Sequence, residues 1–162
     1  MSTGDALDVT VNTDRFDGVD AAELERAVRR TLASQGTEEG ELSLTLLDDA
    51  GIRALNLRYL GEDRTTDVIA FALGPGPALL GDVYVGVEQA RRQAAELGVP
   101  LPEELVRLAV HGTLHALGHD HPEGPGREES PMFTLQEALV REIRGGSAGS
   151  APAVRRDPRN PR

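Results

Sequence analysis

An uncharged, mostly apolar stretch from Leu108 to Gly118 constrains the fold of this 162-residue chain more than any other feature. It continues a helical pattern that begins at Leu101 and runs to Leu117. Leu, Val and Ala occupy most angular positions of the stretch, so the helix has no wide polar face. We therefore expect this helix to be buried by other elements on several sides.

The hydrophobic periods elsewhere predict strands and helices in alternation. Apolar and polar residues alternate at 7–11 and at 42–46, and 66–73 is a continuous apolar run, as is typical of strands. The segment GPGPALLG at 74–81 is expected to be irregular, and a further strand follows at 81–87. Helices are expected from Asp20 to Gly36, from Asp48 or Asp49 to Gly61 with Ile52, Leu55 and Tyr59 on one face, over 87–97, over 101–117, and from Ser130-Pro131 to Gly145-Gly146.

This order of elements predicts an α+β fold with a small mixed β-sheet and helices packed against it. A single domain is expected over residues 1–144, followed by a disordered, Arg-containing tail at 145–162 that is rich in Gly, Ser, Ala and Pro. Cysteine is absent, and no stretch approaches the roughly 20 apolar residues of a membrane-spanning helix. We therefore expect a cytoplasmic protein without a membrane partner.

All four histidines lie between positions 111 and 121, in the sequence HGTLHALGHDH. His111 and His115 are four residues apart, so they share one face of the expected helix, about 6 Å apart along its axis. Gly118 can end the helix in left-handed geometry, which lets His121 approach the same ion from a second direction. Three imidazoles with a fourth position open to water form a catalytic zinc site. We predict one Zn²⁺ per chain, held by His111, His115 and His121.

The roles of His119 and Asp120 stay open. Adjacent residues on a turn point in different directions, so His119 is expected at the rim of the site, not on the ion. Asp120 could orient a ligand imidazole, bind substrate or cap the turn, and it is the candidate for a catalytic residue. A structural zinc site needs four protein ligands, so recruitment of His119 would indicate a structural ion.

The histidine spacing also matches the metzincin signature H-E-x-x-H-x-x-G-x-x-H. In those proteases, the Glu after the first His is the general base for the zinc-bound water. That position is Gly112 here, and glycine offers no base. The sequence therefore has the ligand spacing of a metzincin without its catalytic group, which argues against peptidase activity.

HGTLHALGHDH resembles the H-G-x-L-H-x-x-G-x-D-H signature of the YbeY family of bacterial rRNA maturation factors and metal-dependent endoribonucleases. Further segments are similar to family blocks in order and spacing: LN at 55–56 with TTDVIAF at 65–71, LLGDVYV at 79–85 and MFTLQEALV at 132–140. The similarity runs from about residue 7 to residue 144. It implies a zincin-like metal-hydrolase arrangement, with zinc held at the end of a central helix by the three histidines named above.

The resemblance also implies an activity, which is zinc-dependent cleavage of single-stranded RNA. The cleavage would serve 16S rRNA 3′-end maturation and ribosome quality control, with ribosomal RNA, the small ribosomal subunit and assembly factors as partners. Many members have an arginine after the Tyr of the L-N-x-x-Y-R segment, where this chain has Leu60. Arg58 and Arg64 lie nearby in the sequence and are the candidates for substrate binding.

The charge of the chain leaves other functions open. The formal net charge is −10, and the tail is net positive, so the remainder is more acidic still. Affinity for phosphates normally comes from basic surface. The alternatives to the nuclease are a ribosome-assembly binding factor with a structural zinc, which Leu60 and the missing base at Gly112 favour, and a metal hydrolase of a small substrate. With Gly112 in place of a base, cleavage would depend on zinc-bound hydroxide, on Asp120 as the proton acceptor or on the RNA's own 2′-OH.

Overall fold

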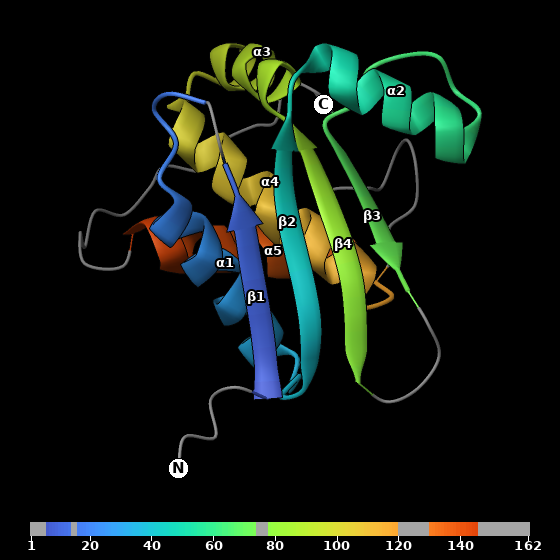
Figure 1. Cartoon of the computed structure of the whole chain (residues 1–162). Helices are drawn as coiled ribbons and strands as arrows, with labels where there is room; N and C mark the ends of the chain where they lie inside the picture. The colour runs from blue at the N-terminus through green and yellow to red at the C-terminus, as the bar shows by residue number, and fades with distance from the viewer. Residues whose placement is uncertain (1–5, 14–15, 74–77, 120–129, 146–162) are drawn as a thin grey trace.

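The structure, a computed structural model, describes residues 6–13, 16–73, 78–119 and 130–145. These residues form four strands and five helices in the order that the sequence predicts (Figure 1). The α+β class with a mixed sheet is confirmed. The elements are β1 (Leu7–Asn12), α1 (Ala21–Ser34), β2 (Gly40–Leu47), α2 (Asp49–Leu60), β3 (Val68–Ala72), β4 (Leu79–Gly86), α3 (Val87–Leu97), α4 (Leu101–Ala116) and α5 (Pro131–Gly145).

The four strands form one sheet in the order β1-β2-β4-β3. β1, β2 and β4 are parallel, whereas β3 runs antiparallel to β4 and lies at an edge. Parallel neighbours need crossover connections, which α1 supplies between β1 and β2. The antiparallel strand β3 precedes β4 directly in the sequence, so this edge of the sheet is built by a local connection.

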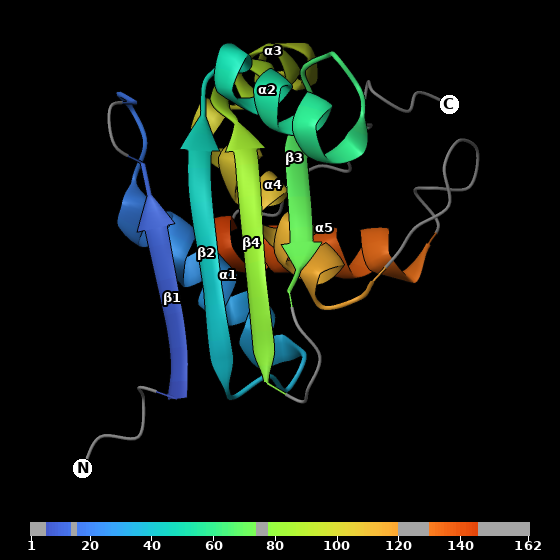
Figure 2. The same cartoon turned by 45° about the vertical axis from the view of Figure 1, so that its right-hand side comes forward.

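The helices fall into two groups around the sheet. Figures 1 and 2 show α1, α4 and α5 on one face of the sheet, and α2 and α3 near the end at which β2 and β4 finish. Helix α4 contacts α1, α3, α5, β3 and β4. Its side chains Leu108, Val110 and Leu114 are almost completely buried, as the uncharged stretch from Leu108 to Gly118 leads one to expect.

Side-chain caps fix where three of the helices begin. The side chains of Asp20, Asp48 and Ser130 each accept a hydrogen bond from a backbone N–H in the first turn of α1, α2 and α5. Such caps satisfy N–H groups that have no partner within the helix. All three residues are those at which the sequence predicts that a helix begins.

The expectation that residues 74–81 are irregular is wrong for its last part. Strand β4 begins at Leu79, because Leu79–Gly81 pair in parallel with Gly40–Leu42 of β2. The partner segment lies far away in the sequence, so neither local periodicity nor the flanking Gly and Pro residues could indicate the pairing.

The apolar face that the sequence predicts for α2 is only partly buried. Ile52 is buried, but Tyr59 is 53% exposed. The buried face continues through Asn56, whose side-chain amide donates to the carbonyl oxygen of Arg64 at 2.9 Å. A polar residue is buried here because it holds the loop that follows the helix. Within the described residues, no helix combines the length and apolar character needed to span a membrane.

Candidate metal centre

His111 and His115 lie on successive turns in the C-terminal half of α4. Their ring centroids are 4.6 Å apart and the ring planes meet at 71°. Both residues are half-buried, although Gly112, Thr113 and Leu114 between them are buried. The predicted pairing of these two imidazoles on one helix face is therefore present, with partial access from outside.

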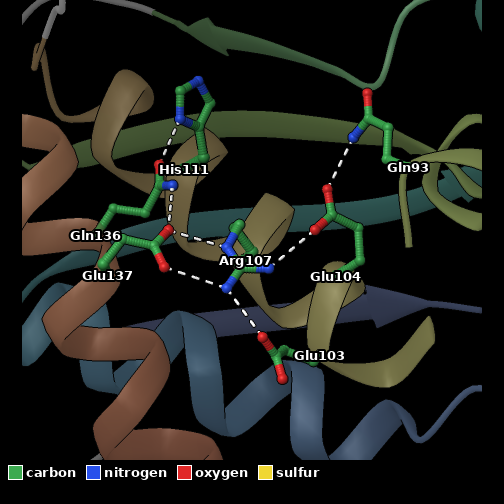
Figure 3. Close-up of polar contacts among 7 residues, drawn as sticks. All are labelled: Gln93, Glu103, Glu104, Arg107, His111, Gln136 and Glu137. Carbon is green, nitrogen blue, oxygen red and sulfur yellow. Dashed lines mark hydrogen bonds and ion pairs between the residues drawn. The ribbon is translucent and has the colours of Figure 1, made fainter. Parts of the chain in front are cut away.

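The ring of His111 is held by a residue of α5. Its Nδ1 atom lies 2.6 Å from Oε1 of Gln136 (Figure 3). Gln136 is only 4% exposed. Sequence reasoning missed this residue. Gln136 belongs to the M-F-x-x-Q-E segment of the closing helix, and the resemblance of this segment to a family block is the signal that could have found it. The sequence alone does not indicate which residue Gln136 contacts.

Gln136 adjoins an ion-pair network centred on the buried Arg107 (Figure 3). Arg107 of α4 donates to both carboxylate oxygens of Glu137, from Nε at 2.9 Å and from Nη2 at 3.1 Å. It also donates to Glu104 at 2.9 Å and to Glu103 at 3.0 Å. Burial acts against the charged form of Arg107, but the hydrogen bonds and charges of these carboxylates outweigh it and raise its pKa. The guanidinium therefore stays protonated.

Gly118 ends α4 and turns the chain back. Its φ angle is +100°, and its N–H donates to the carbonyl oxygen of His115 at 2.9 Å. The N–H of His119 donates to the carbonyl oxygen of Leu114, also at 2.9 Å. These two bonds form a Schellman motif, in which glycine is favoured because the left-handed region strains other residues. The prediction that Gly118 ends the helix in this geometry is confirmed.

The remaining predicted site residues are less fully described. The Nε2 atom of His119 lies 2.8 Å from Oε1 of Gln35, the residue that caps the C-terminus of α1. Asp120 and His121 lie outside the described residues. Among the residues that the structure does describe, no group of three or more His, Asp or Glu side chains is arranged to hold a metal ion. The described part of the site is therefore a histidine pair.

Gly112 lies on the face of α4 that packs against the sheet. A Cβ atom built on it would stand 2.4 Å from Cγ1 of Val83 and 3.0 Å from Cγ2 of Val68. No side chain fits in this space unless Val83 or the backbone moves. The position that carries the general base in metzincins therefore faces the sheet here and has no room for a carboxylate.

The two arginines predicted to bind substrate lie on and after α2. The guanidinium carbon of Arg58 stands 5.2 Å from the centroid of the Tyr59 ring, a cation–π contact. Arg64 forms an exposed ion pair with Glu62. Leu60, at the position where many family members have arginine, is 55% exposed. An arginine in its place would therefore meet solvent.

Comparisons with known proteins agree with the segments quoted above. The family model of endoribonuclease YbeY matches residues 9–144. This chain belongs to the YbeY family. Membership confirms the resemblance. It also confirms the predicted enzyme class, which is a hydrolytic endoribonuclease.

Individual YbeY relatives match over most of their length. Endoribonuclease YbeY of Desulfitobacterium hafniense is 44% identical over 132 residues, which cover 74% of this chain and 83% of the relative. The endoribonuclease YbeY of Moorella thermoacetica is 40% identical over 154 residues, covering 85% and 97%. The solution structure of TM1509 from Thermotoga maritima superposes with a TM-score of 0.57 at 25% identity, covering 91% of this chain and 99% of that one. This chain thus shares its fold with a solved structure, and the match covers nearly the whole length of that structure.

Proposed function

We propose that this protein is a zinc-dependent endoribonuclease that cleaves single-stranded RNA, with His111, His115 and His121 as the metal ligands. The observation that carries the proposal is the pair of adjacent imidazoles, 4.6 Å apart, on the helix that Gly118 closes. This pair of imidazoles fits zinc, because neutral imidazole nitrogens are ligands that zinc prefers. When bound, the ion would polarise a phosphate oxygen and lower the pKa of bound water.

The turn at the end of α4 supports a three-ligand site. The Schellman motif reverses the chain immediately before Asp120 and His121, which is the direction change that a third ligand from this segment requires. The contact of His119 with Gln35 gives that imidazole a partner on α1. We therefore propose that His119 is not a ligand and that the fourth position is left for water or substrate, as in zincin-like hydrolases.

The proton acceptor in this proposal does not come from α4. Gly112 packs against Val83 and leaves no room for a carboxylate at the metzincin position. We propose that Asp120 would accept the proton of the attacking water, or that of the RNA 2′-OH if this hydroxyl is the nucleophile. Arg58 and Arg64 are proposed to bind phosphates, since guanidinium groups bind them through two parallel hydrogen bonds.

The family and the extent of the match support the wider role. We propose that residues 1–144 form the hydrolase domain and that 145–162 form an Arg-containing tail. The substrate in the cell would be ribosomal RNA in the cytoplasm, at the 3′ end of 16S rRNA, with the small ribosomal subunit and its assembly factors as partners. Ribosome quality control would use the same cleavage.

A second candidate function is a ribosome-assembly factor whose zinc is structural. Exposed Leu60 favours it, because an arginine for RNA is missing at this position. The lack of a base at Gly112 favours it as well. Such a protein would bind RNA and zinc but would not cleave.

The test is cleavage of a single-stranded RNA by purified, zinc-loaded protein, with a duplex of the same sequence as the comparison substrate. His115→Ala and chelator treatment should each abolish cleavage, and added zinc should restore it only in the chelated wild type. His119→Ala is the matched control, because it removes an imidazole that contacts Gln35, and it should keep its activity. Zinc binding without cleavage by the folded wild type would favour the assembly factor, whereas hydrolysis of small phosphodiesters alone would favour the small-substrate hydrolase.

A further inference from the structure

The side-chain amide of Gln136 has a different partner at each end. Its Nε2 atom donates to Oε2 of Glu137 at 3.0 Å, and its Oε1 atom lies 2.6 Å from Nδ1 of His111. An amide oxygen can only accept a hydrogen bond. The hydrogen in the contact with His111 must therefore belong to Nδ1 of the imidazole.

The Glu137 carboxylate determines which way this amide points. A carboxylate only accepts hydrogen bonds, so a flipped amide would place its oxygen against the oxygen of Glu137. Glu137 itself cannot turn away easily, since Arg107 donates to both of its oxygens. Arg107 is 8% exposed and also bonded to buried Glu104. The orientation of Gln136 thus follows from an ion pair that packing and charge hold in place.

The consequence for His111 concerns its other ring nitrogen. In a neutral imidazole only one nitrogen carries a hydrogen, and the other has the lone pair that binds a metal. With the hydrogen on Nδ1, the lone pair is on Nε2. Figure 3 shows Nε2 on the side of the ring that points away from Gln136.

We propose that Gln136 is a positioning residue that holds His111 in the Nδ1–H tautomer and presents Nε2 as the metal ligand, with Glu137 and Arg107 orienting its amide. The metal in this statement rests on the proposed function, whereas the tautomer is a property of the protein without metal. Ligand histidines commonly depend on such a partner for ring orientation and basicity.

The first test measures the tautomer in metal-free protein with ¹⁵N-labelled histidine. Long-range ¹H–¹⁵N correlation spectra distinguish Nδ1–H from Nε2–H, and single His→Gln variants assign the four rings. Wild-type His111 should be in the Nδ1–H form at a pH where the ring is neutral. Gln136→Met, which keeps the length of the side chain but removes the amide, should shift His111 toward the Nε2–H form that an unconstrained histidine side chain favours.

Gln93→Met is the matched control. Gln93 is 6% exposed and donates to Glu104 at 2.8 Å, at the far end of the same network. The Gln93→Met variant therefore loses an equivalent buried amide but keeps the contact between Gln136 and His111. The His111 signals in its spectrum should be unchanged. Glu137→Gln is a second variant that keeps the shape but removes the charge that orients the amide, and it should give a mixture of tautomers.

The second test measures zinc affinity by competition with a chromophoric chelator, with no RNA present. Gln136→Met should weaken zinc binding by about tenfold to a hundredfold, and Gln93→Met should leave it unchanged. Urea unfolding of both variants shows whether the native state is retained.

The outcomes separate this proposal from the proposed function. An Nε2–H tautomer in wild-type His111, no tautomer shift in Gln136→Met, or an equal loss of zinc affinity in the Gln136 and Gln93 variants would overturn it. A tautomer shift in a protein that binds no zinc at all would contradict the proposed function yet support the positioning of His111 by Gln136.

Discussion

Gly112 of α4 and Val83 of β4 lie so close together that no side chain separates the helix from the sheet. A Cβ atom on the glycine would stand 2.4 Å from the nearest methyl carbon of the valine. Real Cβ atoms do not approach other carbons so closely, so this glycine determines how near α4 can lie to the sheet. The neighbouring His111 lies at a position that depends on that spacing.

Gly112→Ala should therefore destabilise the protein by about 1–3 kcal/mol, the usual cost of overpacking a buried site. Urea unfolding measures the change. Gly145→Ala in α5 is the control, because no atom of the described residues lies within 4 Å of its Cβ position apart from its chain neighbours and its own helical turn, and it should be close to neutral. Combining Gly112→Ala with Val83→Ala should cost less than the sum of the two single changes. Additive costs would contradict the contact.

A second prediction concerns the left-handed glycine at the end of α4. Gly118→Ala should cost about 1–2 kcal/mol, because φ is +100°. Gly61→Ala at the end of α2, where φ is +73°, should lose stability for the same reason. Only the Gly118 variant should also bind zinc more weakly, since its turn leads toward the proposed third ligand. Equal zinc affinities, measured by chelator competition, would show that the turn does not position His121.

A third prediction uses the exposed end of α2. Leu60→Arg should tighten binding to single-stranded RNA and steepen its salt dependence, by about 0.7 in log–log slope for each phosphate contacted. Leu57→Arg adds the same charge on the same helix, where Leu57 is 50% exposed, and should have a smaller effect. Fluorescence anisotropy at several salt concentrations measures both. The same gain from either arginine would indicate an effect of net charge, not of position.

A fourth prediction concerns the buried cation. Arg107→Met should destabilise the protein by about 3–5 kcal/mol, because Glu104 is fully buried and would lose its charged partner. Adding Glu104→Gln should restore part of the loss. Arg53→Met breaks an exposed pair with Asp63 and should leave the unfolding midpoint almost unchanged. If Arg107→Met were as mild as Arg53→Met, the network would not be a source of stability.

The order of strands and helices could be predicted from the sequence because it depends on local patterns. Period-two alternation marks β1 and β2, and capping side chains such as Asp20 and Ser130 mark where helices begin. The start of β4 at Leu79 could not be predicted, since only its pairing with β2 makes that residue part of a strand. Exposure of Tyr59 likewise depends on how α2 packs near the end of the sheet.

The candidate site also has a part that could be predicted from the sequence and a part that could not. His111 and His115 follow from their spacing on one helix, and the turn at Gly118 follows from residue type. Gln136 could not be predicted because it reaches His111 across the packing of α5 on α4, 25 residues along the chain. The sequence shows that Gly112 offers no base, but only the sheet explains why a side chain is excluded there.

The position of the histidine pair on α4 has an electrostatic consequence. His115 lies in the last turn of the helix, where the peptide dipoles leave a partial negative charge on the terminal carbonyl groups. That end of a helix attracts cations and repels phosphates. The backbone of α4 thus favours a cation over an RNA phosphate beside its own imidazoles, which is the order of binding that the proposed metal centre requires.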